Sequence, residues 1–347
     1  MATTYVNQLA GKSVTVLIAA YNDWPSVAKL IPEIDKVLIP LNMEARVVIV
    51  DDGSTDMTGL DEIESGNYPS IGAIDILTLA SNQGNQRAVA CGVAYVAEYA
   101  QSDYMVVMDG DHEDKPDYIP ELLRACADSR DTRIVFAGRS KRSESRLFKI
   151  MYWGYRQVYR LATGLPISAG NFSVVPRHLT KRLAHIAELW SHFPASIQRA
   201  RLPYDSIPTE RGQRLLGQSK MNMFRLLIHA FSGLTVYADI LAARVMLAAI
   251  VSTGFLGTAT LWLIIEKLFT SIPIIGWSSL MIMAVAGMAL QIISTAGMIL
   301  LIILALRQQP PMIPAIDYHR FVLEVRRING GTDLFDAPPI RIMPSGR

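Results

Sequence analysis

Short apolar runs alternate with amphipathic stretches along residues 14–138 of the chain. The apolar runs predict β-strands at Val14–Ala20, Ala45–Val50, Ala73–Leu79, Tyr104–Met108 and Ile134–Ala137. Amphipathic stretches between them, such as Trp24–Leu38 and Gln86–Tyr99, predict helices. This alternation is typical of an α/β fold in which right-handed crossovers build a mostly parallel, Rossmann-like sheet. Ligands of such sheets bind at the carboxyl ends of the strands.

Two later stretches are apolar enough to cross a membrane. Residues 245–265 and 268–306 carry no charged side chain, and a span needs about 20 apolar residues. Pro273, Gly276 and Trp277 interrupt the second stretch near its start. We therefore predict a transmembrane hairpin with helices at about 241–265 and 278–306. A very hydrophobic helical hairpin buried in a soluble protein is the alternative.

Charged residues around the predicted hairpin indicate its orientation. The turn between the spans carries only Glu266 and Lys267, whereas basic residues flank both outer ends. Because basic residues gather in cytoplasmic segments, both termini are expected in the cytoplasm, with a bacterial inner membrane as the location. The flanking basic residues are Arg225, Arg244, Arg307, Arg320, Arg326 and Arg327.

The domain organisation follows from these spans. Residues 1–235 are predicted to form the catalytic domain and residues 307–347 a cytoplasmic C-terminal tail, with one strand near Phe321–Val325. Residues 140–165 interleave basic and aromatic side chains, which predicts an amphipathic helix lying in a membrane interface. An ordinary surface helix is the alternative there. Residues 221–240 are expected to be a second interfacial helix leading into the first span.

Composition narrows the classes of function. A net charge of +2 gives no sign of a nucleic-acid partner. No G-x-G-x-x-G and no P-loop motif follows a predicted strand, which disfavours a classical dinucleotide site. Cys91 and Cys126 lack metal-site spacing and are expected to be reduced thiols without a chemical role. Small residues in the spans leave a homo-oligomer open, because they permit close helix packing: Gly254, Gly257, Gly287 and Gly297.

The strongest candidate chemistry is an acidic cluster after one apolar run. Asp109 and Asp111 come directly after Tyr104–Met108, and Glu113 and Asp114 follow. Hard divalent cations such as Mg²⁺ or Mn²⁺ choose carboxylate ligands, usually while also holding a phosphate. A solvated acidic turn is the alternative.

Two further polar clusters follow predicted strands. In the stretch Asp51–Asp56, a carboxylate could accept a hydrogen bond from a nucleobase, and Gly53 permits a sharp turn. A strand, a turn and a helix cap without further function are the alternative there. The stretch Asn82–Arg87 forms a third junction between strand and helix, where Arg87 can reach a phosphate.

The order and spacing of the motifs resemble those of family 2 inverting glycosyltransferases with a GT-A fold, over about residues 13–235. The segments that carry this resemblance are Ala19–Asp23, Asp51–Asp56, Asn82–Arg87 and Asp109–Asp114. A catalytic domain followed by two spans resembles the polyprenyl-phosphate group of that family. The run Arg211–Lys220 is similar to the basic R-x-x-G-x-S-K element which that group places before its membrane part. The resemblance implies a nucleotide-diphospho-sugar donor and a polyprenyl phosphate acceptor, with undecaprenyl phosphate as the default.

The resemblance also implies a role for each matching residue. Metal ligands would be Asp109, Asp111 and Glu113. Nucleotide-sugar binding would involve Ala19, Tyr21, Asp23, Asp52, Arg87, Asp109 and Asp111. Lipid-phosphate binding would involve Arg139, Arg146, Arg214, Ser219 and Lys220. The residues expected in catalysis are Asp109, Asp111, Asp114, Arg139 and Arg214.

Two alternative functions remain open. Gln198–Leu202 is similar to the Q-x-x-R-W element of processive polysaccharide synthases, although Leu202 replaces the tryptophan. Two spans are also few for a polymer channel. The other alternative is a non-enzymatic membrane protein that binds nucleotide sugars.

Overall fold

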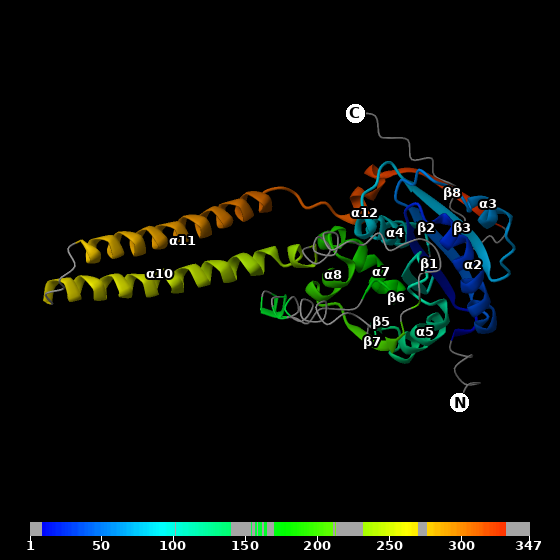
Figure 1. The fold of residues 1–347 in the computed structure, drawn as a ribbon. Helices are drawn as coiled ribbons and strands as arrows, with labels where there is room; N and C mark the ends of the chain where they lie inside the picture. Colours follow the sequence, from blue (N-terminus) through cyan, green and yellow to red (C-terminus); the bar gives the residue numbers. More distant parts are fainter. Residues whose placement is uncertain are drawn as a thin grey trace. The chain divides into compact units, whose positions relative to one another are not determined.

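The chain forms two compact units in the computed structural model (Figure 1). Unit 1 comprises Met1–Ile150, Ile167–Val236 and Met312–Arg347, and unit 2 comprises Met151–Pro166 and Tyr237–Pro311. The structure describes residues 9–100, 102–139, 154, 157, 159–161, 163–164, 170–210, 212, 232–269 and 276–330.

An eight-stranded sheet forms the centre of unit 1, in the order β7-β5-β6-β4-β1-β2-β3-β8. Strands β1 to β4 are mutually parallel, whereas β6 and β8 run antiparallel to their neighbours. Each strand predicted between residues 14 and 138 is present, so the mostly parallel α/β fold is confirmed. The strands are β1 Ser13–Ala20, β2 Glu44–Asp51, β3 Ile71–Leu79, β4 Tyr104–Asp109, β5 Ile134–Arg139, β6 Ser173–Pro176, β7 Tyr204–Thr209 and β8 Val322–Gly330.

Helices cover both faces of the sheet and bury two apolar clusters. On one face, α2 (Trp24–Leu38) and α5 (Ile119–Asp128) pack against a cluster that includes Trp24 and Leu122. On the other face, α4 (Asn85–Tyr99) packs against a cluster that includes Val93. The shorter helices of unit 1 are η1 Ile39–Leu41, α3 Leu60–Ser65, η2 Pro116–Tyr118, α7 Arg177–Ala184, η3 Ala187–Trp190, α8 Phe193–Arg199, α12 Pro314–Asp317 and η4 Tyr318–Arg320.

The segment after the predicted spans contributes an edge strand to the sheet. The sequence predicts a short strand near Phe321–Val325 in a separate tail, whereas β8 extends to Gly330 and pairs along β3. Arg327 of β8 forms an ion pair with Asp75 of β3, 2.7 Å between Nε and Oδ1. The tail from Met312 onward therefore belongs to unit 1, and β8 pairs the backbone groups that β3 would otherwise expose at the edge of the sheet.

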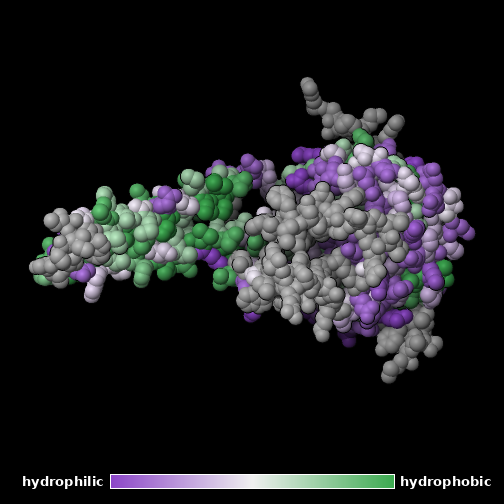
Figure 2. Space-filling view, viewed as in Figure 1, coloured by the Kyte–Doolittle hydropathy of each residue, from purple (hydrophilic) through white to green (hydrophobic). Residues whose placement is uncertain are grey.

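Unit 2 contains two long apolar helices, α10 (Ala238–Phe269) and α11 (Trp277–Arg307). They enclose the predicted spans 241–265 and 278–306. Figure 2 shows mostly apolar residues along the visible face of the two helices, and the most apolar 18-residue window of each has 0% of its residues buried. Core helices of soluble proteins are mostly buried, so these two helices have the length and the exposed apolar surface to cross a membrane.

Candidate active site

The carboxyl ends of β1, β2 and β4 bring the acidic motifs together. In the sheet register, Ala19 of β1 is opposite Asp109 of β4, and Ala20 is opposite Asp51 of β2. The backbone N–H of Asp52 also donates to the carbonyl of Ala20, at 2.9 Å. Because the strands are parallel, motifs separated by more than 50 residues of sequence meet at one edge of the sheet.

The loop after β4 is held by its own carboxylates. The N–H of Asp109 donates to Oδ2 of Asp114 at 3.0 Å, and the N–H of Glu113 donates to Oδ1 of Asp111 at 3.1 Å. His112 has a φ of 64° and is buried, and burial lowers the pKa of its imidazole. Asp114 is also buried. The carboxylate of Asp114 therefore holds the loop in shape.

Two side-chain amides contact Asp109. Nδ2 of Asn85 and Nδ2 of Asn171 each lie 3.2 Å from Oδ1 of Asp109. Asn85 begins α4, and Asn171 stands two residues before β6. The sequence analysis missed Asn171, because a four-residue strand gives little periodic signal and its pairing with β4 depends on distant residues.

Asp52 anchors the Asn82–Arg87 loop. Its carboxylate accepts the N–H groups of Gln83 at 2.6 Å and Gly84 at 2.8 Å, and only 3% of the residue is exposed. Burial raises the pKa of Asp52, and the two backbone N–H groups partly oppose that rise. Arg87, in the first turn of α4, donates to Oε1 of Gln83 at 3.1 Å. The sequence predicts that Asp52 lines a nucleotide. In the structure its carboxylate holds the backbone of Gln83 and Gly84 in place.

The segment between β1 and α2 joins the second acidic motif. Oδ1 of Asn22 accepts the N–H groups of Thr55 at 2.8 Å and Asp56 at 3.1 Å. Asp23 precedes α2, and its carboxylate accepts a hydrogen bond from the hydroxyl of Ser26 at 2.7 Å. Tyr21 is 41% exposed at the same edge of the sheet. Asn22 is a further residue that motif reading did not single out.

The chain after β7 lies against the loop after β4. The N–H of Gly212 donates to the carbonyl of Glu113 at 2.8 Å, and a Cβ on Gly212 would collide with the carbonyl of His112. Glu210 pairs with Lys115 at 3.5 Å. The start of the basic run Arg211–Lys220 is therefore in contact with the Asp109–Asp114 loop.

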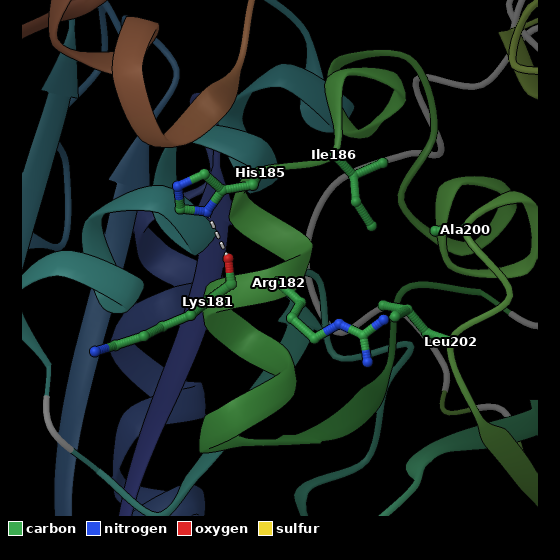
Figure 3. Close-up of a pocket in the computed structure, with 6 residues that line it drawn as sticks. All are labelled: Lys181, Arg182, His185, Ile186, Ala200 and Leu202. Atoms are coloured by element: carbon green, nitrogen blue, oxygen red, sulfur yellow. Dashed lines mark hydrogen bonds between the residues drawn. The ribbon is translucent and has the colours of Figure 1, made fainter.

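A surface pocket of about 440 Å³ lies away from these motifs (Figure 3). The ring of His185 is directed toward the carbonyl of Lys181, with Nδ1 at 2.8 Å. Nearby, Gln198 donates to the hydroxyl of Tyr204 at 3.1 Å, and Arg199 pairs with Glu188. The residues that line the pocket are Lys181, Arg182, His185, Ile186, Ala200 and Leu202.

Comparison with known proteins shows which family this chain resembles. The model of Glycosyl transferase family 2 matches residues 15–184. The uncharacterized glycosyltransferase YkcC of Bacillus subtilis is 25% identical over 276 residues, which cover 77% of this chain and 81% of that protein. These matches support an assignment to glycosyl transferase family 2.

Solved structures support the same fold. Glucosyl-3-phosphoglycerate synthase from Mycobacterium tuberculosis, in complex with Mn²⁺, UDP-glucose and phosphoglyceric acid, superimposes with a TM-score of 0.52 at 15% identity, covering 70% of this chain and 84% of that chain. The same enzyme with Mg²⁺ and UDP gives a TM-score of 0.50 at 16% identity, covering 69% and 83%. The GT-A fold expected from the sequence is confirmed.

The side chains at this edge of the sheet fit a divalent cation shared with a substrate. Among the described residues, no three His, Cys, Asp or Glu side chains converge to hold a metal ion. Mg²⁺ is usually held by one or two carboxylates together with substrate phosphates rather than by an all-protein cage. Asp109 and Asp111 could supply such a pair of hard oxygen donors. The ligand roles of Asp109, Asp111 and Glu113 all stay predictions.

Several predicted phosphate-binding residues lie outside the described part of the chain. Arg139 ends β5 opposite Thr209 in the register, but its side chain is not among those described. The segment 140–165, where an interfacial helix is predicted, is described only at a few positions, and residues 213–231 are not described. The residues concerned are Arg146, Arg214, Ser219 and Lys220.

Proposed function

We propose that this protein is a membrane-bound inverting glycosyltransferase that moves a sugar from a nucleotide-diphospho-sugar to a polyprenyl phosphate. The observation that carries the proposal is the place of α10 and α11 in the chain. They follow β7 and precede β8, and both strands belong to the sheet that carries the acidic motifs. A soluble acceptor would not require two exposed apolar helices within a catalytic chain, whereas a lipid acceptor lies in a membrane.

The strand order also supports the proposed topology. Unit 1 contains chain both before α10 and after α11, so both outer ends of the hairpin lie on one side of any membrane that it crosses. The basic residues that flank the hairpin favour the cytoplasm as this side. Donor nucleotide sugars and the phosphate of a membrane lipid would then meet at the inner surface of a bacterial membrane.

The chemistry depends on the leaving group. A nucleoside diphosphate departs with growing negative charge, and Mg²⁺ or Mn²⁺ bound at Asp109 and Asp111 would stabilise that charge. We propose that Arg87 holds a donor phosphate, since its guanidinium donates to Gln83 in the loop that Asp52 anchors. In the M. tuberculosis synthase, Mn²⁺ and UDP-glucose are bound together, and we propose the same combination of ion and donor class for this chain.

The acceptor needs little activation. A phosphate monoester has a second pKa near about 6 and is mostly dianionic at neutral pH. The chain therefore has to position this nucleophile rather than deprotonate it, so that attack opposite the nucleotide inverts the anomeric carbon. Arg139, Arg214 and Lys220 are proposed to hold the lipid phosphate. We assign Asp114 to positioning, because its carboxylate accepts the N–H of Asp109.

A donor and acceptor screen tests the proposal. The full chain in nanodiscs is incubated with undecaprenyl phosphate, Mn²⁺ or Mg²⁺ and a panel of UDP- and GDP-sugars. The masses of the lipid products are then measured by mass spectrometry. A product one sugar heavier than the lipid is expected with one donor. Soluble phosphoglyceric acid is the matched acceptor control. A long polymer would favour a processive synthase, transfer only to phosphoglyceric acid would reject the lipid acceptor, and no product with any donor would reject the enzyme class.

A further inference from the structure

The two carboxylate oxygens of Asp109 have different surroundings. Oδ1 accepts hydrogen bonds from Asn85 and Asn171, each at 3.2 Å. A carboxylate has about four lone-pair sites, roughly two on each oxygen, so two donors occupy Oδ1. Within the described residues no hydrogen bond reaches Oδ2. The carboxylate therefore presents one occupied oxygen and one available oxygen.

The direction of the buried amide of Asn171 is fixed by a chain of hydrogen bonds. The backbone N–H of Phe193 can only donate, and it lies 2.6 Å from Oε1 of Gln86. The other end of that side chain, Nε2, must then face Oδ1 of Asn171, at 3.3 Å. Nδ2 of Asn171 is left to face Asp109. Asn171 is only 6% exposed, and the contacts that run from α8 to β4 are part-buried.

We propose that Asn85 and Asn171 are positioning residues that make Asp109 bind its divalent cation through Oδ2 alone, and so favour Mg²⁺ or Mn²⁺ over Ca²⁺. This inference rests on the proposed metal-dependent transfer. Mg²⁺ demands near-octahedral geometry with few protein ligands, whereas Ca²⁺ accepts six to eight oxygens and often takes both oxygens of one carboxylate. Oδ1 of Asp109 already accepts two N–H groups. It therefore cannot act as the second oxygen when a Ca²⁺ ion binds both oxygens of this carboxylate.

Metal competition tests the inference without turnover. Mn²⁺ binding to the full chain in detergent is followed by electron paramagnetic resonance in the presence of UDP or, in parallel, GDP, and Ca²⁺ is then titrated as a competitor. Wild-type protein should release Mn²⁺ only at high Ca²⁺. Asn85→Ala and Asn171→Ala should each lower the ratio of the Ca²⁺ to the Mn²⁺ dissociation constant, and the double variant should lower it by about tenfold or more, as changes beside metal ligands commonly do.

Controls separate positioning from folding. Asn67→Ala changes an exposed asparagine in the loop before β3 and should leave the ratio unchanged. Thermal unfolding is recorded for every variant. If Asn171→Ala fails to fold, Asn85→Ala still tests the effect of the amides on metal selectivity. Asn85 is exposed, so its replacement should not disturb folding.

The outcomes distinguish the two proposals. Equal losses of Mn²⁺ and Ca²⁺ affinity, or an unchanged ratio in a folded double variant, would overturn the role of the two amides. Failure of wild-type protein to bind Mn²⁺ with either nucleotide would instead overturn the proposed metal-dependent function.

Discussion

Arg327 of β8 and Asp75 of β3 form an ion pair across 252 residues of sequence. Asp75 is fully buried and also pairs with Arg46 of β2, which is itself fully buried. The hydroxyl of Tyr95 donates to Oδ2 of Asp75 at 2.9 Å. One carboxylate thus joins β2, β3, α4 and the strand that follows both apolar helices.

Removal of the Asp75 carboxylate should destabilise unit 1 strongly. Asp75→Ala leaves the guanidinium of Arg46 buried without its charge partner, which typically costs about 3–5 kcal/mol and here should lower the melting temperature by roughly 10 °C. Asp205→Ala is the matched control, because it breaks an exposed ion pair with Arg133 that is worth about 0–1 kcal/mol. Thermal unfolding in detergent measures both variants. Similar melting temperatures for the two would contradict a structural role of the buried pair.

Each carboxylate of the metal pair should be required for transfer. We expect Asp109→Asn and Asp111→Asn to lower lipid-sugar formation by at least about a hundredfold while the fold is kept, because a charged ligand of the cation is lost. Asp117→Asn, an exposed acid in the following 3-10 helix, should be near wild type. Near-normal turnover of either site variant at saturating Mn²⁺ would show that the metal assignment is wrong.

Gly212 should be intolerant of any side chain. The Cβ of Gly212→Ala would collide with the carbonyl of His112, so the chain after β7 must move away from the Asp109–Asp114 loop. We expect transfer to fall by about tenfold or more, since misplacement of about 1 Å near a reacting centre can cost a hundredfold. Gly254→Ala, which has open space in α10, is the control. Kinetics of both variants in nanodiscs give the comparison.

Arg214 is expected to serve the acceptor rather than the donor. Arg214→Ala should raise the KM for lipid phosphate while nucleotide affinity, measured by titration calorimetry, stays within about twofold, because a lost phosphate contact weakens mainly the ligand it touches. Loss of nucleotide affinity with an unchanged KM for the lipid would place Arg214 on the donor diphosphate instead.

The two cysteines should be unreactive in the folded protein. Burial raises the pKa of Cys91 and of Cys126 to about 12, so the thiolate that attacks a disulfide reagent is scarce at neutral pH. An aromatic disulfide reagent should label neither cysteine in native protein at pH 8 and both after denaturation, as followed by absorbance. Rapid labelling of the native chain would contradict the burial of these thiols.

Local patterns in the sequence are enough to define the elements and the class of the site. Val14–Ala20 and Tyr104–Met108 are apolar on both faces because parallel strands in this sheet are covered by helices on both sides. α2 has the bounds that its pattern predicts, Trp24 to Leu38. Carboxylates that follow predicted strands also indicate a site, since the carboxyl ends of parallel strands lie at one edge of the sheet.

Tertiary structure alone decides the partners of those elements. The strand that begins at Val322 pairs along β3 and brings Arg327 to the buried Asp75, and no local pattern specifies a contact across 252 residues. Asn171 reaches Asp109 because the short β6 pairs antiparallel with β4, which a four-residue run does not reveal. Sequence periodicity reports which face of an element is buried. Which distant side chain completes a hydrogen bond depends on the folded sheet.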